Sequence, residues 1–446
     1  SSRLGFVLAT AGSAVGLGNI WRFPYLAAKY GGGIFLLVYI ILALTFGYTL
    51  IMAETSLGRM TRKSPVGAFE SFGNSRFISI GGWINAIIPI LIVPYYSVIG
   101  GWVIKYLIEY FAGHSKTLAG DAYFTTFISN GWSTEICFII FTLFTLGIIY
   151  AGVRNGIERV SKFMMPILIV LSLIIAVYSV TRPGAIEGVK YFLVPNFDHF
   201  SWMTVVSAMG QMFYSLSIAM GILITFGSYM KKDTSIEKST ENVEIFDTAI
   251  AIMAGLMIIP AVFAFSGGNA ETLKSGPALM FITIPKVFAN MGFGTAIGVV
   301  FFLLVLFAAV TSSIALTESA VSTFEDELHW SRKKSTVFMG MVMLLLGTLS
   351  CLGYGPLANF KILGMQFLDF FDFITNSVMM PIAAIATCLL VSKVVGVDKI
   401  EEEIKKDGQV FRRKKIFCFM IKYLCPLFAA IILISSVANA FGIITM

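Results

Sequence analysis

The segment Ala11-Gly12-Ser13-Ala14-Val15-Gly16-Leu17-Gly18-Asn19 lies inside an apolar run, from about residue 4 to residue 30, that is long enough to cross a membrane. A spanning helix keeps its backbone hydrogen bonds internal, because lipid offers no partners. Glycine in a helix interior costs about 1 kcal/mol relative to alanine, so the glycines of this segment favour a break in the helix. Non-helical backbone at this depth is tolerated only where protein buries it or where it lines a cavity. We therefore expect the free carbonyl and amide groups of this segment to bind a ligand.

The rest of the chain has the composition of a polytopic membrane protein. Of its 446 residues, 57% are hydrophobic and only 13% are charged, against about 25% charged residues in a soluble domain. The net charge of +7 is spread among short loops, which argues against a nucleic-acid surface. We predict an all-α bundle of eleven helices, at about 4–30, 33–57, 82–111, 133–150, 159–181, 203–230, 243–268, 294–327, 335–353, 361–392 and 416–443.

The basic residues predict the orientation of the chain, because Lys and Arg are enriched in cytoplasmic loops. With the N-terminus inside, 22 Lys and Arg residues fall on the inner side and seven on the outer side. The chain contains no N-x-Ser/Thr sequon, which favours a bacterial source. We therefore predict a multi-pass protein of the inner (plasma) membrane with a cytoplasmic N-terminus and an external C-terminus. The charged loop 393–415 is either an amphipathic helix on the inner surface or a solvated connector.

A second candidate break lies in the sixth predicted span, where 210–221 reads GQMFYSLSIAMG. Five spans separate it from the first break, and an odd number of spans inverts a repeat. We predict an inverted pair of five-helix repeats at 1–181 and 199–392, joined by an outer loop at 182–198. An inner loop at 393–415 and an eleventh helix at 416–446 follow. Paired interrupted segments are the best indication in a sequence of a transporter binding site.

Polar groups inside the spans indicate what the two breaks bind. Na⁺ prefers several oxygen ligands; broken helices supply carbonyl oxygens, and Thr311 and Ser312 supply hydroxyls. Half-helix N-termini carry partial positive charge and suit a substrate carboxylate. Three alternatives stay open: the hydroxyls bond within their own helix, Asp247 lies near the membrane interface, and Glu54 caps unwound backbone. No ATP-binding loop or metalloprotease motif occurs, so we do not expect an enzyme.

Several segments resemble the neurotransmitter:sodium symporters, in the same order along the chain. They are the stretch from Ala11 to Tyr25, Gly31-Gly32-Gly33, Glu54-Thr55-Ser56-Leu57-Gly58-Arg59, Tyr95-Tyr96, Gly210-Gln211-Met212-Phe213-Tyr214-Ser215-Leu216-Ser217, Thr311-Ser312-Ser313-Ile314-Ala315 and Phe324-Glu325-Asp326-Glu327-Leu328. The resemblance implies a 5+5 inverted-repeat symporter with broken helices 1 and 6. The family usually has twelve helices, and this chain is similar to bacterial amino-acid transporters that have eleven.

The resemblance also implies a complete binding site. One sodium ion would bind the Ala14 carbonyl, Asn19, Ser215, Asp247 and the substrate carboxylate. The other would bind carbonyls of Gly12, Val15 and Ala308 and hydroxyls of Thr311 and Ser312. The substrate backbone would contact Tyr96, Leu17, Gly18, Ala14, Tyr214 and Ser215, and its side chain would lie among Ile92, Tyr214, Ser217, Met220, Ser312 and Leu316. The outer gate would pair Arg22 with Asp372 under a lid of Tyr96 and Tyr214, and the inner gate would use Tyr229 and Asp326.

Three departures from the family pattern sharpen the predicted substrate. Gly16 stands where monoamine members carry Asp, so the substrate should bring its own carboxylate. Asp247 stands where the family usually has Asn, and Ala251 where chloride-dependent members have Ser, which predicts chloride-independent transport. Met220 replaces a bulky aromatic residue and, with Ser217, should admit a large apolar or aromatic side chain. We expect Na⁺-coupled import of a hydrophobic or aromatic L-amino acid, with tyrosine as the leading candidate. The alternative is a sodium-dependent, amino-acid-gated channel or receptor.

Overall fold

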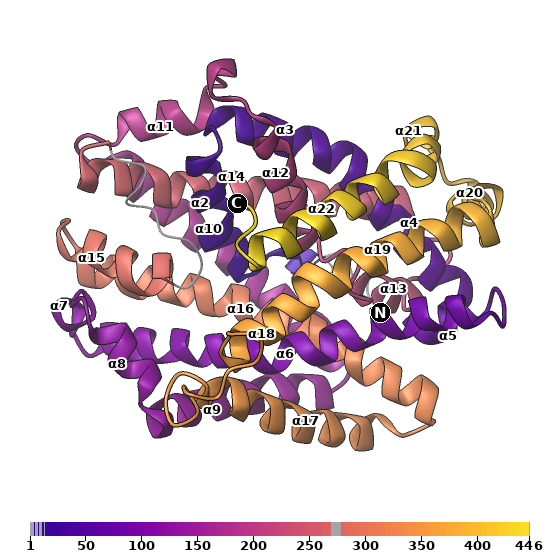
Figure 1. The fold of residues 1–446 in the computed structure, drawn as a ribbon, viewed down its shortest axis with the longest axis horizontal. Helices are drawn as coiled ribbons and strands as arrows, with labels where there is room; N and C mark the ends of the chain where they lie inside the picture. Colours follow the sequence, from indigo (N-terminus) through magenta and orange to yellow (C-terminus); the bar gives the residue numbers. More distant parts are fainter. Residues whose placement is uncertain (1–3, 5–7, 9–10, 13, 269–277, 446) are drawn as a thin grey trace.

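The computed structural model of the chain describes residues 4, 8, 11, 12, 14–268 and 278–445. Within these residues the chain forms helices and contains no β-strand. Most of the long helices run across the view of Figure 1 in roughly one direction, as in a membrane-spanning bundle. The predicted all-α fold is therefore confirmed. Arg3 and Lys274, which enter the count of basic residues, lie outside the described residues.

Nine continuous helical runs of the described residues are long and apolar enough to cross a membrane. The two interrupted helices bring the total to the eleven predicted spans. The continuous runs are Gly33–Thr61 (α3, η1 and α4), Arg76–Phe111 (α6), Gly131–Tyr150 (α9), Val153–Val180 (η2 and α10), Ile236–Ser266 (α14), Gly294–Leu328 (α16), Arg332–Leu352 (α17), Phe367–Val395 (α18, η6, α19 and η7) and Lys414–Ala440 (α21, η9 and α22).

Several predicted boundaries move, because the helices extend past the apolar run or begin after it: the starts predicted at 82, 159, 243 and 361 lie at Arg76, Val153, Ile236 and Phe367. Two of them show the reason. The helix predicted at 243–268 begins at Ile236, where the Ser235 side chain accepts a hydrogen bond from the Lys238 amide and caps a polar first turn. The helix predicted at 361–392 begins at Phe367, because Ile362 and Met365 pair their backbones in a turn. Short helices occupy the connections: α5 (Pro65–Glu70), α7 (Ser115–Leu118), α8 (Tyr123–Ser129), α11 (Ile186–Leu193), α15 (Ile284–Ala289) and α20 (Val397–Ile404).

The first predicted break lies at Val15 and Gly16. Helix α2 (Leu17–Lys29) begins there, and Gly16 has extended backbone angles of φ −137° and ψ −171°. The amide of Val15 still bonds to the Gly12 carbonyl, so the helical path stops and restarts within a few residues. The described backbone thus confirms the interruption that the glycines predict.

The second break separates α12 (Trp202–Ser215) from α13 (Ile222–Ser228). Two of the residues between them that are not glycine, Ser217 and Ala219, have left-handed φ angles of 56° and 63°. Such a conformation costs roughly 1–2 kcal/mol for an L-residue, so surrounding groups must hold it. The buried Glu54 carboxylate does so by accepting hydrogen bonds from the Ala219 amide at 3.1 and 3.3 Å. The expectation that Glu54 caps unwound backbone is confirmed.

Helices α4 (Tyr48–Thr61) and α13 pack backbone against backbone. A Cβ atom at Gly58 would lie 2.0 Å from the Ile224 carbonyl oxygen, and one at Gly227 would lie 2.5 Å from the Thr55 carbonyl oxygen. No side chain fits at either position without separating the helices. The half of the second broken helix that follows the break, α13, is therefore tightly joined to α4.

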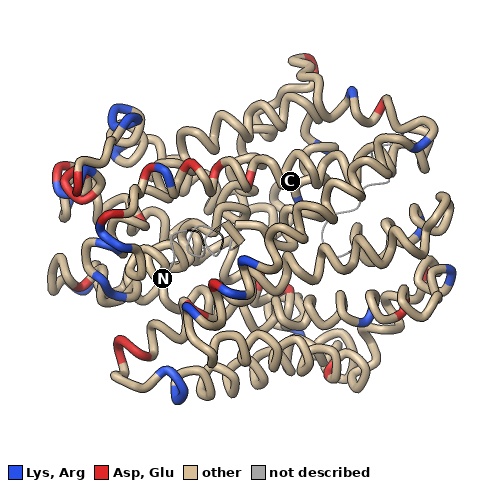
Figure 2. The backbone as a smooth tube through the Cα atoms, turned by 180° about the vertical axis from the view of Figure 1, so that it is seen from behind, with Lys and Arg blue, Asp and Glu red and all other residues tan. Residues whose placement is uncertain are grey.

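The charged residues are unevenly distributed along the bundle. Figure 2 shows most Lys, Arg, Asp and Glu residues at one end, which holds the loops after α4, α13 and η7. The middle of the bundle carries few charges. This end holds the loops that the sequence assigns to the inner side, and the orientation itself stays a prediction.

Candidate functional site

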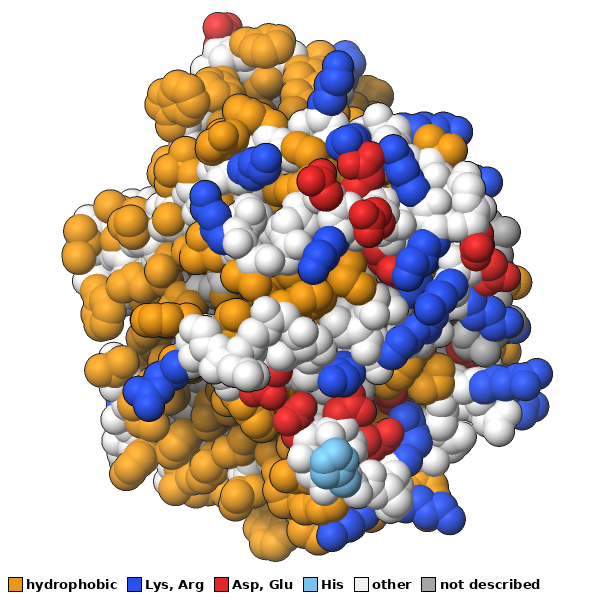
Figure 3. Space-filling view, turned by 90° about the vertical axis from the view of Figure 1, so that its right-hand side faces the viewer, with side chains coloured by type: hydrophobic (Ala, Val, Ile, Leu, Met, Phe, Trp, Pro, Cys, Tyr) orange, Lys and Arg blue, Asp and Glu red, His pale blue; other side chains and the backbone are white. Residues whose placement is uncertain are grey.

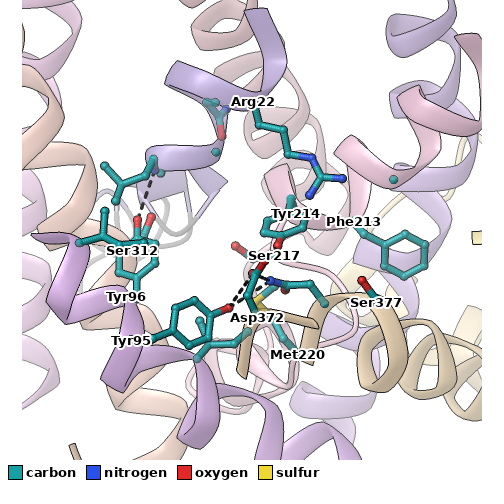
Figure 4. Close-up of a pocket in the computed structure, with 18 of the residues that line it drawn as sticks. Arg22, Tyr95, Tyr96, Phe213, Tyr214, Ser217, Met220, Ser312, Asp372 and Ser377 are labelled. Atoms are coloured by element: carbon teal, nitrogen blue, oxygen red, sulfur yellow. Dashed lines mark hydrogen bonds between the residues drawn. The ribbon is translucent and has the colours of Figure 1, made fainter. Parts of the chain in front are cut away.

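A cavity of about 480 Å³ lies between the two breaks, with walls from α2, α6, α12, α13, α16, α18 and α22. Figure 4 shows its side chains pointing toward one another from several helices. Ten of the eleven predicted substrate-binding residues line it: Ala14, Leu17, Gly18, Ile92, Tyr96, Tyr214, Ser217, Met220, Ser312 and Leu316. The exception, Ser215, turns its side chain toward Asp247 instead.

The N-terminus of α2 and the Tyr96 hydroxyl lie together at one wall of this cavity. The Leu17 amide donates a hydrogen bond to Tyr96 Oη at 3.3 Å. A Cβ atom at Gly16 would lie 2.6 Å from Ser312 Oγ and 3.1 Å from Tyr96 Oη. The wall therefore combines free amide groups, the positive end of a helix dipole and a hydroxyl, which together suit a carboxylate.

Asp247 is completely buried and bonds to two other predicted sodium ligands, Asn19 and Ser215. Its Oδ1 atom accepts hydrogen bonds from Asn19 Nδ2 at 3.3 Å and from the Ser215 hydroxyl. Its Oδ2 atom accepts from Tyr39 Oη at 2.6 Å. All three donors are neutral, and no cationic side chain among the described residues forms an ion pair with Asp247. A buried carboxylate needs a compensating charge, so this cluster is suited to a bound cation.

Tyr39 is a site residue that sequence reasoning missed. It lies in α3 (Gly33–Leu42), a run of apolar residues in which a tyrosine has no distinguishing pattern. The side chain is fully buried, and its ring packs edge-on against Phe23 at 5.1 Å. One general rule could have indicated it: a buried tyrosine needs a hydrogen-bond partner, and Asp247 in another span could accept that bond.

The five residues predicted for the second sodium ion also lie together. Ser312 Oγ donates to the Val15 carbonyl at 3.0 Å, and Thr311 Oγ1 lies 3.5 Å from the same oxygen. Thr311 Oγ1 also lies 3.1 Å from the Ala308 carbonyl oxygen. A Cβ atom at Gly12 would touch Thr311 Cβ at 3.3 Å. Carbonyl and hydroxyl oxygens from the first break and α16 thus converge, as a site for a hard cation requires.

At the predicted outer gate, Tyr214 lies between Arg22 and Asp372. The guanidinium of Arg22 stacks over the Tyr214 ring at 4.3 Å, a cation–π contact. The Tyr214 hydroxyl donates to Asp372 Oδ1 at 2.9 Å, and Tyr95 Oη donates to the same oxygen at 3.1 Å. The ion pairs of the described residues do not include Arg22 with Asp372, so the expected pair is bridged by Tyr214 in this structure. Figure 4 shows this arrangement beside the cavity.

At the predicted inner gate, Tyr229 and Asp326 have separate partners. The Tyr229 hydroxyl donates to Glu318, whereas Asp326 accepts from the Ser64 amide at 2.7 Å. Glu318 is fully buried and pairs with Arg332 at 2.5 Å. The participation of Tyr229 and Asp326 in an inner gate stays a prediction, and in this structure the two residues bond to different partners. The sequence did not predict the pair of Glu318 with Arg332, because it depends on how α17 folds back against α16.

Comparison with known proteins agrees with this geometry. A model of the sodium:neurotransmitter symporter family matches residues 1–139 and 110–443. The chain belongs to this family. It is 33% identical to the uncharacterized sodium-dependent transporter YhdH of Bacillus subtilis (strain 168), over 100% of this chain and 98% of the relative. It is 31% identical to the uncharacterized sodium-dependent transporter MJ1319 of Methanocaldococcus jannaschii, over 92% of this chain and 84% of the relative.

The solved structure of MhsT in complex with L-phenylalanine is similar to this chain over most of its length. The two share 35% identity with a TM-score of 0.87, over 98% of this chain and 99% of MhsT. The predicted family and the predicted symporter fold are therefore confirmed. As a member of the sodium:neurotransmitter symporter family, the chain is a sodium-dependent membrane transporter and not an enzyme.

The bond between Glu54 and the second break leads to a prediction about stability. Glu54→Leu removes the acceptor of the buried Ala219 amide, and an unsatisfied buried donor costs about 1–3 kcal/mol. We expect the purified variant to lose thermal stability and Na⁺-dependent ligand binding. Glu54→Gln keeps an acceptor oxygen and should retain most of both. Equal melting temperatures for Glu54→Leu and the wild type would contradict this role.

Proposed function

We propose that this symporter couples inward Na⁺ movement to the uptake of a hydrophobic or aromatic L-amino acid, with tyrosine as the leading candidate. The observation that carries the proposal is the cavity between the breaks, where a carboxylate-binding wall adjoins the buried Asp247 cluster. A zwitterion placed there brings its carboxylate to Tyr96 and the Leu17 amide. The relative MhsT, solved with L-phenylalanine, supports an amino acid of this class.

The residues around the cavity support the choice of side chain. Ile92, Met220 and Leu316 supply apolar surface, and Met220 adapts to different shapes. Gly16 leaves no acidic group at this wall for an amine without a carboxylate. A large apolar or aromatic side chain therefore fits the cavity better than a small or cationic one.

Two sodium sites are part of the proposal. One ion binds at Asp247, Asn19, Ser215 and the Ala14 carbonyl, and the other binds among Gly12, Val15, Ala308, Thr311 and Ser312. Each charge that moves inward across 100 mV contributes about 2.3 kcal/mol, so two ions supply roughly 4.6 kcal/mol before their concentration gradient is counted. Asp247 supplies a fixed negative charge beside the first ion, and we propose that transport therefore needs no chloride.

We place the N-terminus in the cytoplasm and the C-terminus outside. The concentration of basic residues at one end of the bundle supports this orientation (Figure 2). In this orientation the Arg22–Tyr214–Asp372 group faces outward, and the Tyr229–Glu318–Arg332 group closes the inner side. The hydrogen bond between Thr225 and Ser319 at 3.2 Å also joins α13 to α16 on that side. These contacts support an outward-facing arrangement with a closed inner path.

Uptake into proteoliposomes tests the proposed function. With an inward Na⁺ gradient and gluconate in place of chloride, we expect labelled tyrosine to accumulate at least about tenfold above the level reached with K⁺. Competition by all common amino acids, each in excess, should rank aromatic and large apolar residues first. Accumulation that ignores Na⁺ would contradict the coupling. Ion current without accumulation of tyrosine would favour the channel alternative.

A further inference from the structure

The segment between η7 and α21, residues 396–413, folds back over one end of the bundle, and we refer to it as the strap. It contains the short helix α20 and lies on the charged end of the molecule that Figure 3 shows. Its buried residues Ile400, Glu403 and Ile404 face the bundle. Of the two alternatives left open from the sequence, the helix is therefore favoured over the solvated connector, and its buried side is docked on the bundle.

Arg59 of α4 binds the strap at its helical end. The side chain is fully buried, and Nε lies 2.9 Å from Glu403 Oε1 while Nη2 lies 2.5 Å from the Glu403 carbonyl oxygen. Nη1 donates to the Thr234 carbonyl at 2.5 Å, in the connection that follows α13. One buried guanidinium therefore holds together α4, the strap and the chain just after α13.

Glu403 is ionised in this contact. Burial opposes its charge, but hydrogen bonds from Lys406 and Arg59 outweigh the burial and lower the pKa of Glu403 below its usual value. The pair consequently keeps its charge at neutral pH. A carboxylate with a lowered pKa stabilises the folded contact above its unfolded pKa and loses that effect as pH falls through the lowered value.

The C-terminal part of the strap binds the same body of helices. Gln409 Nε2 donates to the Asp233 carbonyl at 2.9 Å, and the Arg412 amide donates to Glu237 of α14 at 2.8 Å. Arg413 pairs with Glu244 of α14 at 3.2 Å, and its guanidinium lies 3.6 Å above the Tyr48 ring of α4.

Glu401 of the strap pairs with Lys414 at 2.6 Å, and Lys414 begins α21, the next helix in the chain. Apart from such bonds to η7 and α21, its direct neighbours along the chain, the hydrogen bonds and ion pairs of the strap within the described residues go to η1, α4, α14 or the connection after α13. None goes to α6, α9, α16 or α17.

These partners carry the transport site. Helix α14 holds Asp247, and α13 follows the second break and packs against α4 without intervening side chains. Arg62, the residue that follows α4, also donates to the Ser228 carbonyl at 3.1 Å at the end of α13. At its other end the strap continues into η7, α19, η6 and α18, and α18 ends at Asp372, which binds Tyr214. The strap thus connects the chain segment that carries Asp372 of the outer gate to the helices around the ion site.

We propose that the strap moves as one body with α4, α13 and α14 during transport and couples their motion to the helix that carries Asp372. Arg59 is the positioning residue that keeps the strap docked. The proposal rests on the alternating-access transport described above. It requires that the strap stay bound to these helices when the inner side opens.

A crosslink tests whether the strap must detach. Gln409→Cys and Asp233→Cys, introduced together with Cys418→Ser, place one thiol on the strap and one on the connection after α13. A short bifunctional methanethiosulfonate that dithiothreitol reverses would join them. We expect the crosslinked protein to keep at least half of the Na⁺-driven uptake of the untreated variant, and each single-cysteine variant serves as the control. Loss of uptake that dithiothreitol restores would overturn the proposal.

A second experiment tests Arg59. In Arg59→Ala we expect faster hydrogen–deuterium exchange in the strap and about tenfold slower turnover, with equilibrium binding of tyrosine and Na⁺ within about threefold of the wild type. Arg59→Met combined with Glu403→Leu replaces the buried ion pair by apolar groups, an exchange that proteins often tolerate. This double variant should restore both the protection of the strap and the turnover.

The possible outcomes distinguish a failure of the strap proposal from a failure of the proposed function. Normal turnover in Arg59→Ala with a freely exchanging strap, or unchanged protection of the strap, would overturn the proposal. Absence of Na⁺-driven uptake in the wild type would instead reject the proposed function. In that case hydrogen–deuterium exchange of the wild-type protein, with and without Na⁺, still tests whether the strap moves with these helices. Peptides from the strap, α4 and α13 should then change their protection together.

Discussion

Asp247→Asn is expected to reduce Na⁺-driven amino-acid uptake at least tenfold in chloride-free medium. The substitution keeps the shape of the side chain and removes the only acidic group that Asn19, Ser215 and Tyr39 surround. Two unit charges 4 Å apart interact with about 4 kcal/mol at an effective dielectric constant of 20, far more than the 1.4 kcal/mol that a tenfold change requires. The variant should bind Na⁺ more weakly and recover part of its activity when chloride is added.

The measurement is initial uptake of labelled tyrosine, with gluconate and then chloride as the anion, over a range of Na⁺ concentrations. Asp198→Asn serves as a matched control, because Asp198 is exposed and lies in a connection remote from the Asp247 cluster in sequence. Wild-type uptake by Asp247→Asn without chloride would show that the carboxylate does not replace an anion.

Gly16→Ala is expected to lower substrate affinity by at least tenfold. A Cβ atom at this position would lie 2.6 Å from Ser312 Oγ, which is closer than real side chains approach one another. Ser312 cannot move away without weakening its bond to the Val15 carbonyl, and Tyr96 Oη lies only 3.1 Å from the new atom. The substitution therefore disturbs the carboxylate-binding wall and the second sodium site together.

Gly18→Ala is the matched control for this prediction. A Cβ atom at Gly18 would meet only Tyr214 Cδ1, at 3.9 Å, which is an ordinary contact. Scintillation proximity binding of labelled tyrosine at fixed Na⁺ should show a change of no more than about threefold for Gly18→Ala. Similar affinities for the two alanine variants would indicate that the wall accommodates a side chain at Gly16.

The interruptions of the first and sixth helices were predictable from the sequence, because several glycines and small polar residues close together in an apolar run lower the helix propensity there and favour irregular backbone. The same reasoning identified Asp247, Thr311 and Ser312, since charges and hydroxyls inside lipid are costly and need a purpose. The predicted ends of the helices were less accurate. Capping by Ser235 extends α14 beyond its apolar run, and a hydropathy pattern does not register a cap.

Partners that lie far apart along the chain were not predictable. Tyr39 meets Asp247 across 208 positions, and Arg59 meets Glu403 across 344. Tyr39 stands in no distinguishing local pattern, and the motif Glu54–Arg59 that contains Arg59 gives no indication of its distant partner. The insertion of Tyr214 between Arg22 and Asp372 likewise depends on a ring orientation that only neighbouring helices define.

The sequence by itself determined that this protein spans a membrane, where its two helix breaks lie and which residue types can hold Na⁺ and a carboxylate. These properties are local, because each follows from the free energy of placing a residue or a backbone group in lipid. Only the tertiary structure decided which polar groups pair, that Glu318 bonds to Tyr229 and Arg332, and that the strap docks on α4 and α14. Such pairings depend on the packing of distant helices, where shape determines which of several possible partners a buried charge meets.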